Sequence, residues 1–133
     1  MSGDFTHTKL FWVEFIEENI KFTGHIIDCI GNNVWIVNGL RHRTDGPAVI
    51  TANGSKFWHL NGKYHRTDGP AVEFADGTKY WYLNGLKHRT EGPAIEWANG
   101  DKFWYLNGDN LTEEDWTYTV RLNKLGEFLN GSN

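Results

Sequence analysis

The sequence predicts a mainly β fold, an elongated antiparallel meander or solenoid-like sheet built from 23-residue hairpin repeats and closed by a C-terminal capping helix. Three observations support this prediction. The string HRTDGPAV at 42–49 returns at 65–72 and, as HRTEGPAI, at 88–95. Four tryptophans follow the same 23-residue step: Trp35, Trp58, Trp81 and Trp104. The chain also holds 15 glycines and 15% aromatic residues, a composition typical of strands that alternate with turns.

Each repeat carries two turn signals. In AVEFADGTKYWYL, residues 71–83, the pair Asp76-Gly77 lies between two runs of alternating polarity. An Asp-Gly pair in this setting favours a two-residue type I′ turn, which would place Val72 opposite Trp81. A second turn is expected after each tryptophan, at an Asn-Gly pair. These pairs are Asn38-Gly39, Asn61-Gly62, Asn84-Gly85 and Asn107-Gly108.

This register assigns the strand residues to two faces, because side chains alternate along a strand. The first face is expected to be the core. It holds the four tryptophans with Val49, Val72, Ile95, Leu60, Leu83 and Leu106. The second face is expected to be half exposed. It holds Phe57, Tyr80, Phe103, His59, Tyr82 and Tyr105, beside Glu73 and Glu96.

The repeats divide a single domain, residues 1–133, into three parts. Residues 12–34 form a degenerate repeat, because Trp12 precedes Trp35 by one period, and LFWVEF at 10–15 is expected to be a strand. Residues 35–108 contain three repeats and the start of a fourth, and residues 109–133 hold the helix and tail.

The helix is expected over residues 112–125. Thr112 is the expected N-cap, with Asp115 at the third helical position, and Gly126 is the expected stop. Because a single-layered sheet leaves an apolar face open, we expect this helix to pack on the sheet or to cap the last repeat.

Composition argues against several classes of protein. Thirteen Lys and Arg against 17 Asp and Glu give a net charge of −4, whereas general nucleic-acid binders and proteins of anionic membranes usually carry a positive balance. Cys29 is the single cysteine, so no internal disulfide is expected. With no secretory signal pattern and no stretch of about 20 apolar residues, the expected location is the cytoplasm.

The repeat resembles the MORN family, in particular a divergent group written W-x-x-N-G-x-x-H-R-x-D-G-P-A, and carries Asn-Gly-Lys at 61–63. The match covers 35–108 well and 12–34 weakly. Proteins with this string look like those of tailed bacteriophages and large DNA viruses. The resemblance implies an interaction or scaffold module, with protein or lipid partners and no shared reaction. It also implies a phage accessory protein, which would act in the cytoplasm of an infected host cell.

The HRTDG string has a structural and a functional interpretation. In the structural interpretation, which we favour, it forms a corner: Gly46, Gly69 and Gly92 permit the turn, and Pro47, Pro70 and Pro93 fix the entry to the next strand. Asp45, Asp68 and Glu91 then accept hydrogen bonds from turn amides or from the nearby arginines. In the functional interpretation the same groups form a bank of cationic donors: Arg43, Arg66 and Arg89.

Catalysis and metal binding are not expected. Two strands per repeat place equivalent histidines roughly 10 Å apart, whereas two ligands of one zinc ion lie within about 3–3.5 Å of each other. A catalytic triad needs its three groups at one place, and the repeat presents its polar string three times. The sequence therefore predicts a non-enzyme without cofactor or metal.

Ligand binding remains open. Arginine beside aromatic rings is a common arrangement for holding a nucleotide, and the candidate residues are Arg43, Arg66, Arg89, His59, Tyr80, Tyr82, Phe103 and Tyr105. The favoured hypothesis is a viral protein that docks a host protein, such as a defence factor, through this aromatic face or a sheet edge. One alternative is a sponge that sequesters a small nucleotide immune signal, and another is a structural virion part. Homo-oligomerisation through an open sheet end is also plausible.

Overall fold

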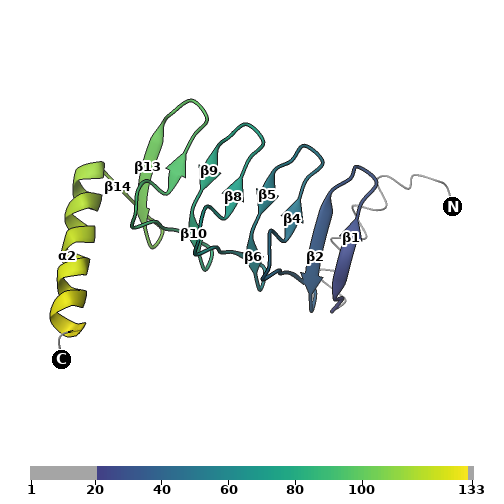
Figure 1. The fold of residues 1–133 in the computed structure, drawn as a ribbon, viewed down its shortest axis with the longest axis horizontal. Helices are drawn as coiled ribbons and strands as arrows, with labels where there is room; N and C mark the ends of the chain where they lie inside the picture. The colour runs from purple at the N-terminus through teal and green to yellow at the C-terminus, as the bar shows by residue number, and fades with distance from the viewer. Residues whose placement is uncertain (1–20, 132–133) are drawn as a thin grey trace.

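The computed structural model describes residues 21–131 and shows an antiparallel β structure followed by one helix (Figure 1). The hairpins follow one another along the long axis of the molecule, and the helix stands at its C-terminal end. The expected strand at 10–15 and Trp12 lie outside the described residues. A mainly β fold with a C-terminal helix is therefore confirmed.

Ten strands form one sheet in the order β1-β2-β4-β5-β8-β9-β12-β13-β14, with β3 paired to β2. Two lower hairpins, β6–β7 and β10–β11, form sheets of their own. The strands are β1 Gly24–Ile27, β2 Asn33–Val37, β3 Leu40–Arg41, β4 Val49–Ile50, β5 Lys56–Phe57, β6 His59–Leu60, β7 Lys63–Tyr64, β8 Val72–Glu73, β9 Lys79–Tyr80, β10 Tyr82–Leu83, β11 Leu86–Lys87, β12 Ile95–Glu96, β13 Lys102–Leu106 and β14 Asp109–Leu111.

The upper hairpins of Figure 1, whose loops end at Gly54, Gly77 and Gly100, differ from the expected register by one residue. Val72 pairs with Tyr80, not with Trp81, because the loop holds three residues, 75–77. Only Gly77 in this loop has a positive φ, of 96°, and Phe74 and Thr78 close it with a backbone hydrogen bond of 2.9 Å. This is the three-residue hairpin loop, which also ends in a left-handed glycine.

The type I′ turns lie instead at the lower Asn-Gly pairs. Asn84 and Gly85 both have positive φ, of 51° and 82°, as a type I′ turn requires. The turns are also joined from one repeat to the next. Gly62 donates to the carbonyl of Arg41, and Gly85 donates to that of Tyr64, each at 2.8 Å.

The one-residue shift moves side chains between faces, since every residue of a strand changes face when the register slips by one. The valines and isoleucines pair with aromatic residues: Val49 with Phe57, Val72 with Tyr80, and Ile95 with Phe103. The expectation that they share a face with the tryptophans is therefore wrong. Glu73 and Glu96, expected on the aromatic face, lie opposite lysines on the tryptophan face, in the order Lys56, Glu73, Lys79, Glu96 and Lys102.

The core is a line of small and β-branched residues that recurs from repeat to repeat. Ala48, Ala71 and Ala94 are fully buried, with Val72 and Ile95 beside them in sequence and nearly as buried. Two hydroxyl groups are buried as well, and each accepts a hydrogen bond from the next hairpin tip: Ser55 from the N–H of Ala75 and Thr78 from that of Ala98, both at 3.0 Å.

Helix α2, Glu113–Gly131, caps the last hairpin. The Thr112 hydroxyl accepts from the N–H of Asp115 at 3.1 Å, which confirms the expected N-cap. The expected stop at Gly126 is wrong, because the helix continues through it for another five residues. The helix contacts β13 and β14, and the indole N–H of Trp116 donates to the carbonyl of Arg89 at 2.9 Å.

Candidate functional site

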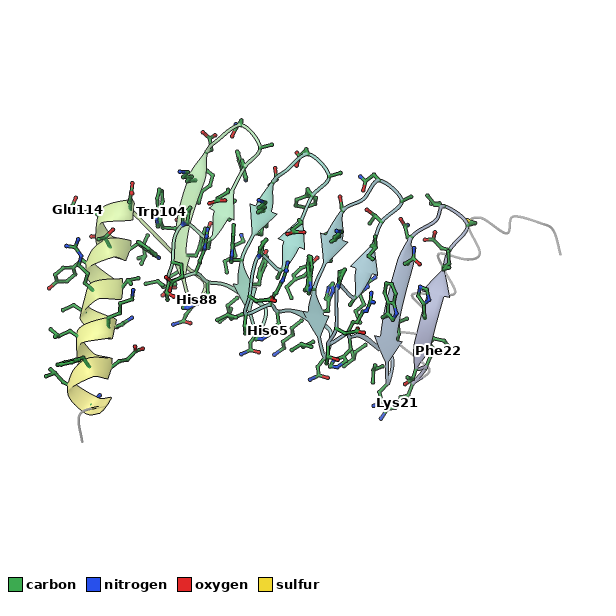
Figure 2. All side chains as sticks on the ribbon, in the orientation of Figure 1. Lys21, Phe22, His65, His88, Trp104 and Glu114 are labelled. Atoms are coloured by element: carbon green, nitrogen blue, oxygen red, sulfur yellow. The ribbon has the colours of Figure 1, made fainter. Side chains whose placement is uncertain are left out.

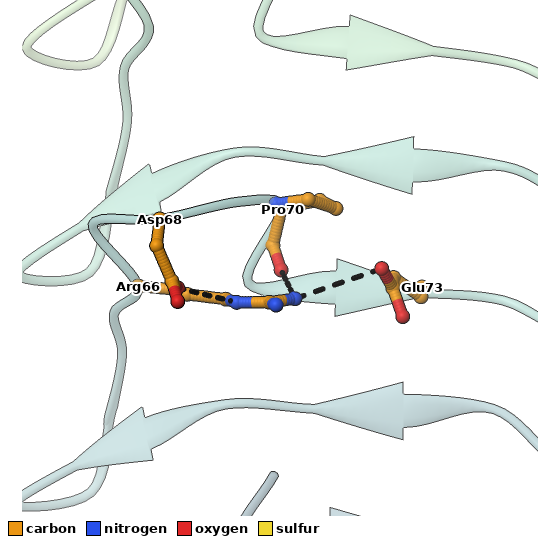
Figure 3. Close-up of polar contacts among 4 residues, drawn as sticks. All are labelled: Arg66, Asp68, Pro70 and Glu73. Carbon is orange, nitrogen blue, oxygen red and sulfur yellow. Dashed lines mark hydrogen bonds and ion pairs between the residues drawn. The ribbon is translucent and has the colours of Figure 1, made fainter. Parts of the chain in front are cut away.

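The corner arginines are held by their own repeat. Figure 3 shows Arg66, whose Nε donates to the Asp68 carboxylate at 2.9 Å and whose Nη1 donates to the Pro70 carbonyl at 3.0 Å. Nη1 also forms an ion pair with Glu73 at 3.6 Å. The guanidinium lies over the Trp58 ring, 3.8 Å from its centre, so one side chain makes a cation–π stack and three polar contacts.

The same arrangement recurs one period earlier and later. Arg43 stacks on Trp35 at 3.8 Å and Arg89 stacks on Trp81 at 3.7 Å, and both donate to the proline carbonyl four residues on. The carboxylate partners differ. Arg43 contacts Asp45 at 2.9 Å, whereas Arg89 forms its ion pair with Glu96 at 3.2 Å.

The corner glycines are small for a steric reason. Gly46, Gly69 and Gly92 do not have the positive φ that a glycine turn would use. A Cβ added at Gly69 would lie 2.9 Å from the Arg66 guanidinium carbon, and the other two corners are almost as close, at 3.1 and 3.2 Å. The expectation that these glycines serve the turn through their backbone freedom is corrected: they leave room for the arginine.

The corner histidines join neighbouring repeats. The Nδ1 atoms of His65 and His88 accept hydrogen bonds from the backbone N–H groups of Asn84 and Asn107, at 2.9 and 3.0 Å. Figure 2 shows both histidines at the same level of successive repeats. An accepting Nδ1 places the proton of the neutral ring on Nε2. Burial lowers the pKa of His88, which keeps it in this form.

Aromatic rings line the opposite side of the sheet. This aromatic face comprises Phe57, His59, Tyr64, Phe74, Tyr80, Tyr82, Trp97, Phe103 and Tyr105. Phe74 touches Phe57 and Tyr80 edge to face at 5.8 and 5.7 Å between ring centres. Tyr82 contacts Tyr64 at 5.0 Å, and burial, the largest influence, raises the pKa of Tyr82.

His59 occupies the place that tyrosine takes in the next two repeats. It is 5% exposed and its ring lies 4.5 Å from that of Tyr64. Burial, with the charge of Arg41 nearby, lowers the pKa of His59 to about 4, so the ring is neutral. Its Nδ1 atom is buried without a hydrogen-bond partner among the described residues.

A shallow groove of about 440 Å³ runs between two hairpin tips on the aromatic face. Phe74, Tyr80 and Trp97 provide its rings, and Asp76, Thr78, Ala98 and Asn99 complete the lining. Phe74 and Trp97 are 38% and 42% exposed. Neither was among the candidate residues expected from the sequence, since the expected register turned both toward the other face. Their signal was an aromatic residue immediately before two of the hairpin tips, whereas Thr51 stands at the equivalent position one repeat earlier.

The arginines and the aromatic rings that were expected to hold a nucleotide together lie on different faces of the sheet. Tyr80 and Tyr82 flank Trp81 in the chain, so their side chains and the Arg89–Trp81 stack lie on opposite faces. On the tryptophan side, grooves do run between successive corners. The first contains Arg43 and Arg66 together with Asp45 and Asp68. Hydrogen bonds from the arginines lower the pKa of both aspartates, so this groove carries as many negative groups as positive ones.

Two features are absent from the described residues 21–131. That part of the chain contains no group of three or more His, Cys, Asp or Glu side chains arranged to hold a metal ion. Its helix is not long and apolar enough to cross a membrane.

Comparison of the chain with family models, with curated proteins and with solved structures finds no match. The MORN resemblance therefore stays a prediction from the repeat string, and the function has to be argued from the two faces themselves.

Proposed function

We propose that this protein is a non-enzymatic interaction module that binds a protein partner through its aromatic face. The observation that supports this most is the pair Phe74 and Trp97, two large rings that stay 38% and 42% exposed on either side of a groove. Aromatic residues are enriched in the anchors of protein interfaces, and clusters of exposed rings are uncommon on surfaces without a partner.

The corner arginines also support a protein partner at the aromatic face, because they are less suited to binding a phosphate. Each corner guanidinium already lies over an indole and donates to a carbonyl of its own corner. An arginine engaged in this way would have to give up internal contacts before it could bind a phosphate. The rings at the hairpin tips need no such rearrangement, so binding there costs less.

The repeat itself supports a scaffold role. The same stacks, clamps and turns recur every 23 residues in the described chain, which is how a solenoid-like protein extends a surface by adding equivalent units. By the resemblance of its HRTDGPA string, we propose that the protein belongs to a bacteriophage and that its partner is a host factor in the bacterial cytoplasm.

An affinity experiment tests the proposal. Tagged protein is incubated with bacterial lysate, and retained proteins are compared between the wild type, the double variant Phe74→Ser/Trp97→Ser and the control Leu86→Ser, which removes an exposed apolar side chain from the lower hairpin. We expect a saturable partner that the control retains and that the double variant binds at least about tenfold more weakly. No saturable partner, or equal retention by the double variant, would contradict the proposal.

A further inference from the structure

The outer side of helix α2 carries a stripe of exposed apolar side chains. Tyr118, Leu122, Leu125 and Leu129 are between 48% and 66% exposed, and successive members are 4, 3 and 4 residues apart. This alternation is the a/d spacing of a helix that packs along a second helix. We call these four residues the helix seam.

The seam points away from the rest of the molecule. The only buried residue of the helix is Val120, and Trp116 on the same side is held by the Arg89 carbonyl. At 3.6 residues per turn, Val120 and the seam lie on opposite sides of the helix. The sheet therefore holds the helix by its inner side and presents the seam outward. Figure 2 shows that helix side chains project away from the strands as well as toward them.

We propose that the seam is a homodimer interface, in which α2 of one copy packs antiparallel against α2 of a second copy. A second copy fits because the seam is self-complementary. A twofold axis between Asn123 and Lys124 places Tyr118 opposite the Leu129 of the other copy and Leu122 opposite its Leu125, so each seam residue meets a seam residue within the helix that the structure describes.

The charges of the helix select the antiparallel direction. The first turn carries Glu113, Glu114 and Asp115, and no basic residue lies in the last turn. Parallel packing would bring six carboxylates together. Antiparallel packing places the two acidic turns at opposite ends of the pair. It also places the positive end of each helix dipole beside the negative end of the other.

Gly126 and Phe128 are both unfavourable on a helix that has no partner, but both fit the antiparallel pair. Gly126 weakens a helix interior, and nothing in its own chain approaches the position of a Cβ there. In the antiparallel pair it lies beside Thr119 of the other copy, where two small residues let the helices approach closely. Phe128, 73% exposed, lies beside Arg121 of the other copy, whose side chain covers the ring.

Light scattering of the full chain over a wide range of concentrations tests the dimer. We expect the mass to rise from 15.3 kDa to twice that value. Leu122→Glu and Leu125→Glu each raise the dissociation constant of the dimer by at least about tenfold, while the control Leu86→Glu leaves it unchanged. Circular dichroism checks that each variant keeps its fold, as expected for exposed positions. A monomer at every concentration, or a dimer that both seam variants retain, would overturn the proposal.

Cysteine crosslinking tests the direction, in a Cys29→Ser background. Antiparallel packing places residue 118 of one copy beside residue 129 of the other. Equivalent residues are displaced by 11 residues, or about 16 Å along the axis, which is beyond the reach of a disulfide. Mixing Tyr118→Cys with Leu129→Cys should therefore give a crosslinked dimer, whereas each variant alone should not. Crosslinking of either variant with itself would show parallel packing and refute the proposal.

Discussion

The Nδ1 atom of His65 accepts a hydrogen bond of 2.9 Å from the backbone N–H of Asn84, which is 19 residues further along the chain. Asn84 is the first residue of a type I′ turn, in the left-handed region with a φ of 51°. The corner of one repeat therefore clamps the turn of the next. The same bond joins His42 to Asn61 and His88 to Asn107.

Replacing His65 by alanine should lower the free energy of unfolding by about 1 kcal/mol, because the Asn84 amide loses its acceptor but stays near solvent. Urea unfolding followed by tryptophan fluorescence measures this change. Thr67→Ala, an exposed position in the same corner, serves as the control and should change stability by less than about 0.5 kcal/mol. Equal effects of the two substitutions would show that the clamp contributes nothing.

His59 should make the protein sensitive to acid. Its pKa is about 4 in the folded chain against 6.5 for the ordinary value. Above pH 6.5 the ring is neutral in both states, so stability does not depend on its titration. Between pH 6.5 and 4 the unfolded state takes up a proton and the folded state does not. The free energy of unfolding should therefore fall by about 3 kcal/mol over this range and level off below it.

His59→Tyr isolates this effect, because tyrosine stands at the equivalent positions Tyr82 and Tyr105. The variant should lack one proton's worth of pH dependence between pH 6.5 and 4, so its stability relative to the wild type should rise by about 2 kcal/mol from pH 7 to pH 5. Urea unfolding at a series of pH values gives both quantities. Parallel curves for the two proteins would mean that another group is responsible.

The two turns of the repeat show how far the sequence determines this fold. The existence and position of both turns follow from the Asn-Gly and Asp-Gly pairs, but the same pairs suit a two-residue loop and the end of a three-residue loop. Asp76 favours the three-residue loop, because its carboxylate accepts a hydrogen bond from the Thr78 N–H at 2.9 Å. Such a local bond shifts the register by one residue, and the faces change with it.

Gly69→Ala should be destabilising for a reason other than backbone strain. The new Cβ would lie 2.9 Å from the Arg66 guanidinium carbon, so the guanidinium must shift from its position over Trp58 and its contacts there weaken. The expected loss is about 1–3 kcal/mol, the usual cost of overpacking. A double-mutant cycle with Arg66→Ala provides the check. Once the arginine is absent, Gly69→Ala should cost much less, whereas an additive cycle would assign the loss to the backbone.

The corner shows the complementary case. The arginine-to-aspartate contact follows from two neighbouring residues, and the corner was expected on that ground. The stack of Arg66 on Trp58 joins residues eight positions apart in the chain, across the lower hairpin β6–β7, whose register was not predicted. Without that register, the arginines could not be placed on the face opposite to Tyr80 and Tyr82. The sequence therefore indicated which aromatic residues to consider, but their placement relative to the arginines was not predictable from it.

Trp116→Phe should loosen the helix while the sheet stays folded. The substitution removes the indole N–H that donates to the Arg89 carbonyl at 2.9 Å, and with it the polar contact that ties α2 to the last corner. We expect a loss of about 1–2 kcal/mol, confined to the end of the molecule. Amide hydrogen exchange should become faster in residues 113–131 and remain unchanged in β4, β5, β8 and β9. Lys124→Met is the control, since it removes one polar group from an exposed helix position outside the helix seam. If both variants exchange like the wild type, the Trp116 contact does not hold the helix. If the sheet also exchanges faster, the helix and the repeats unfold as one unit.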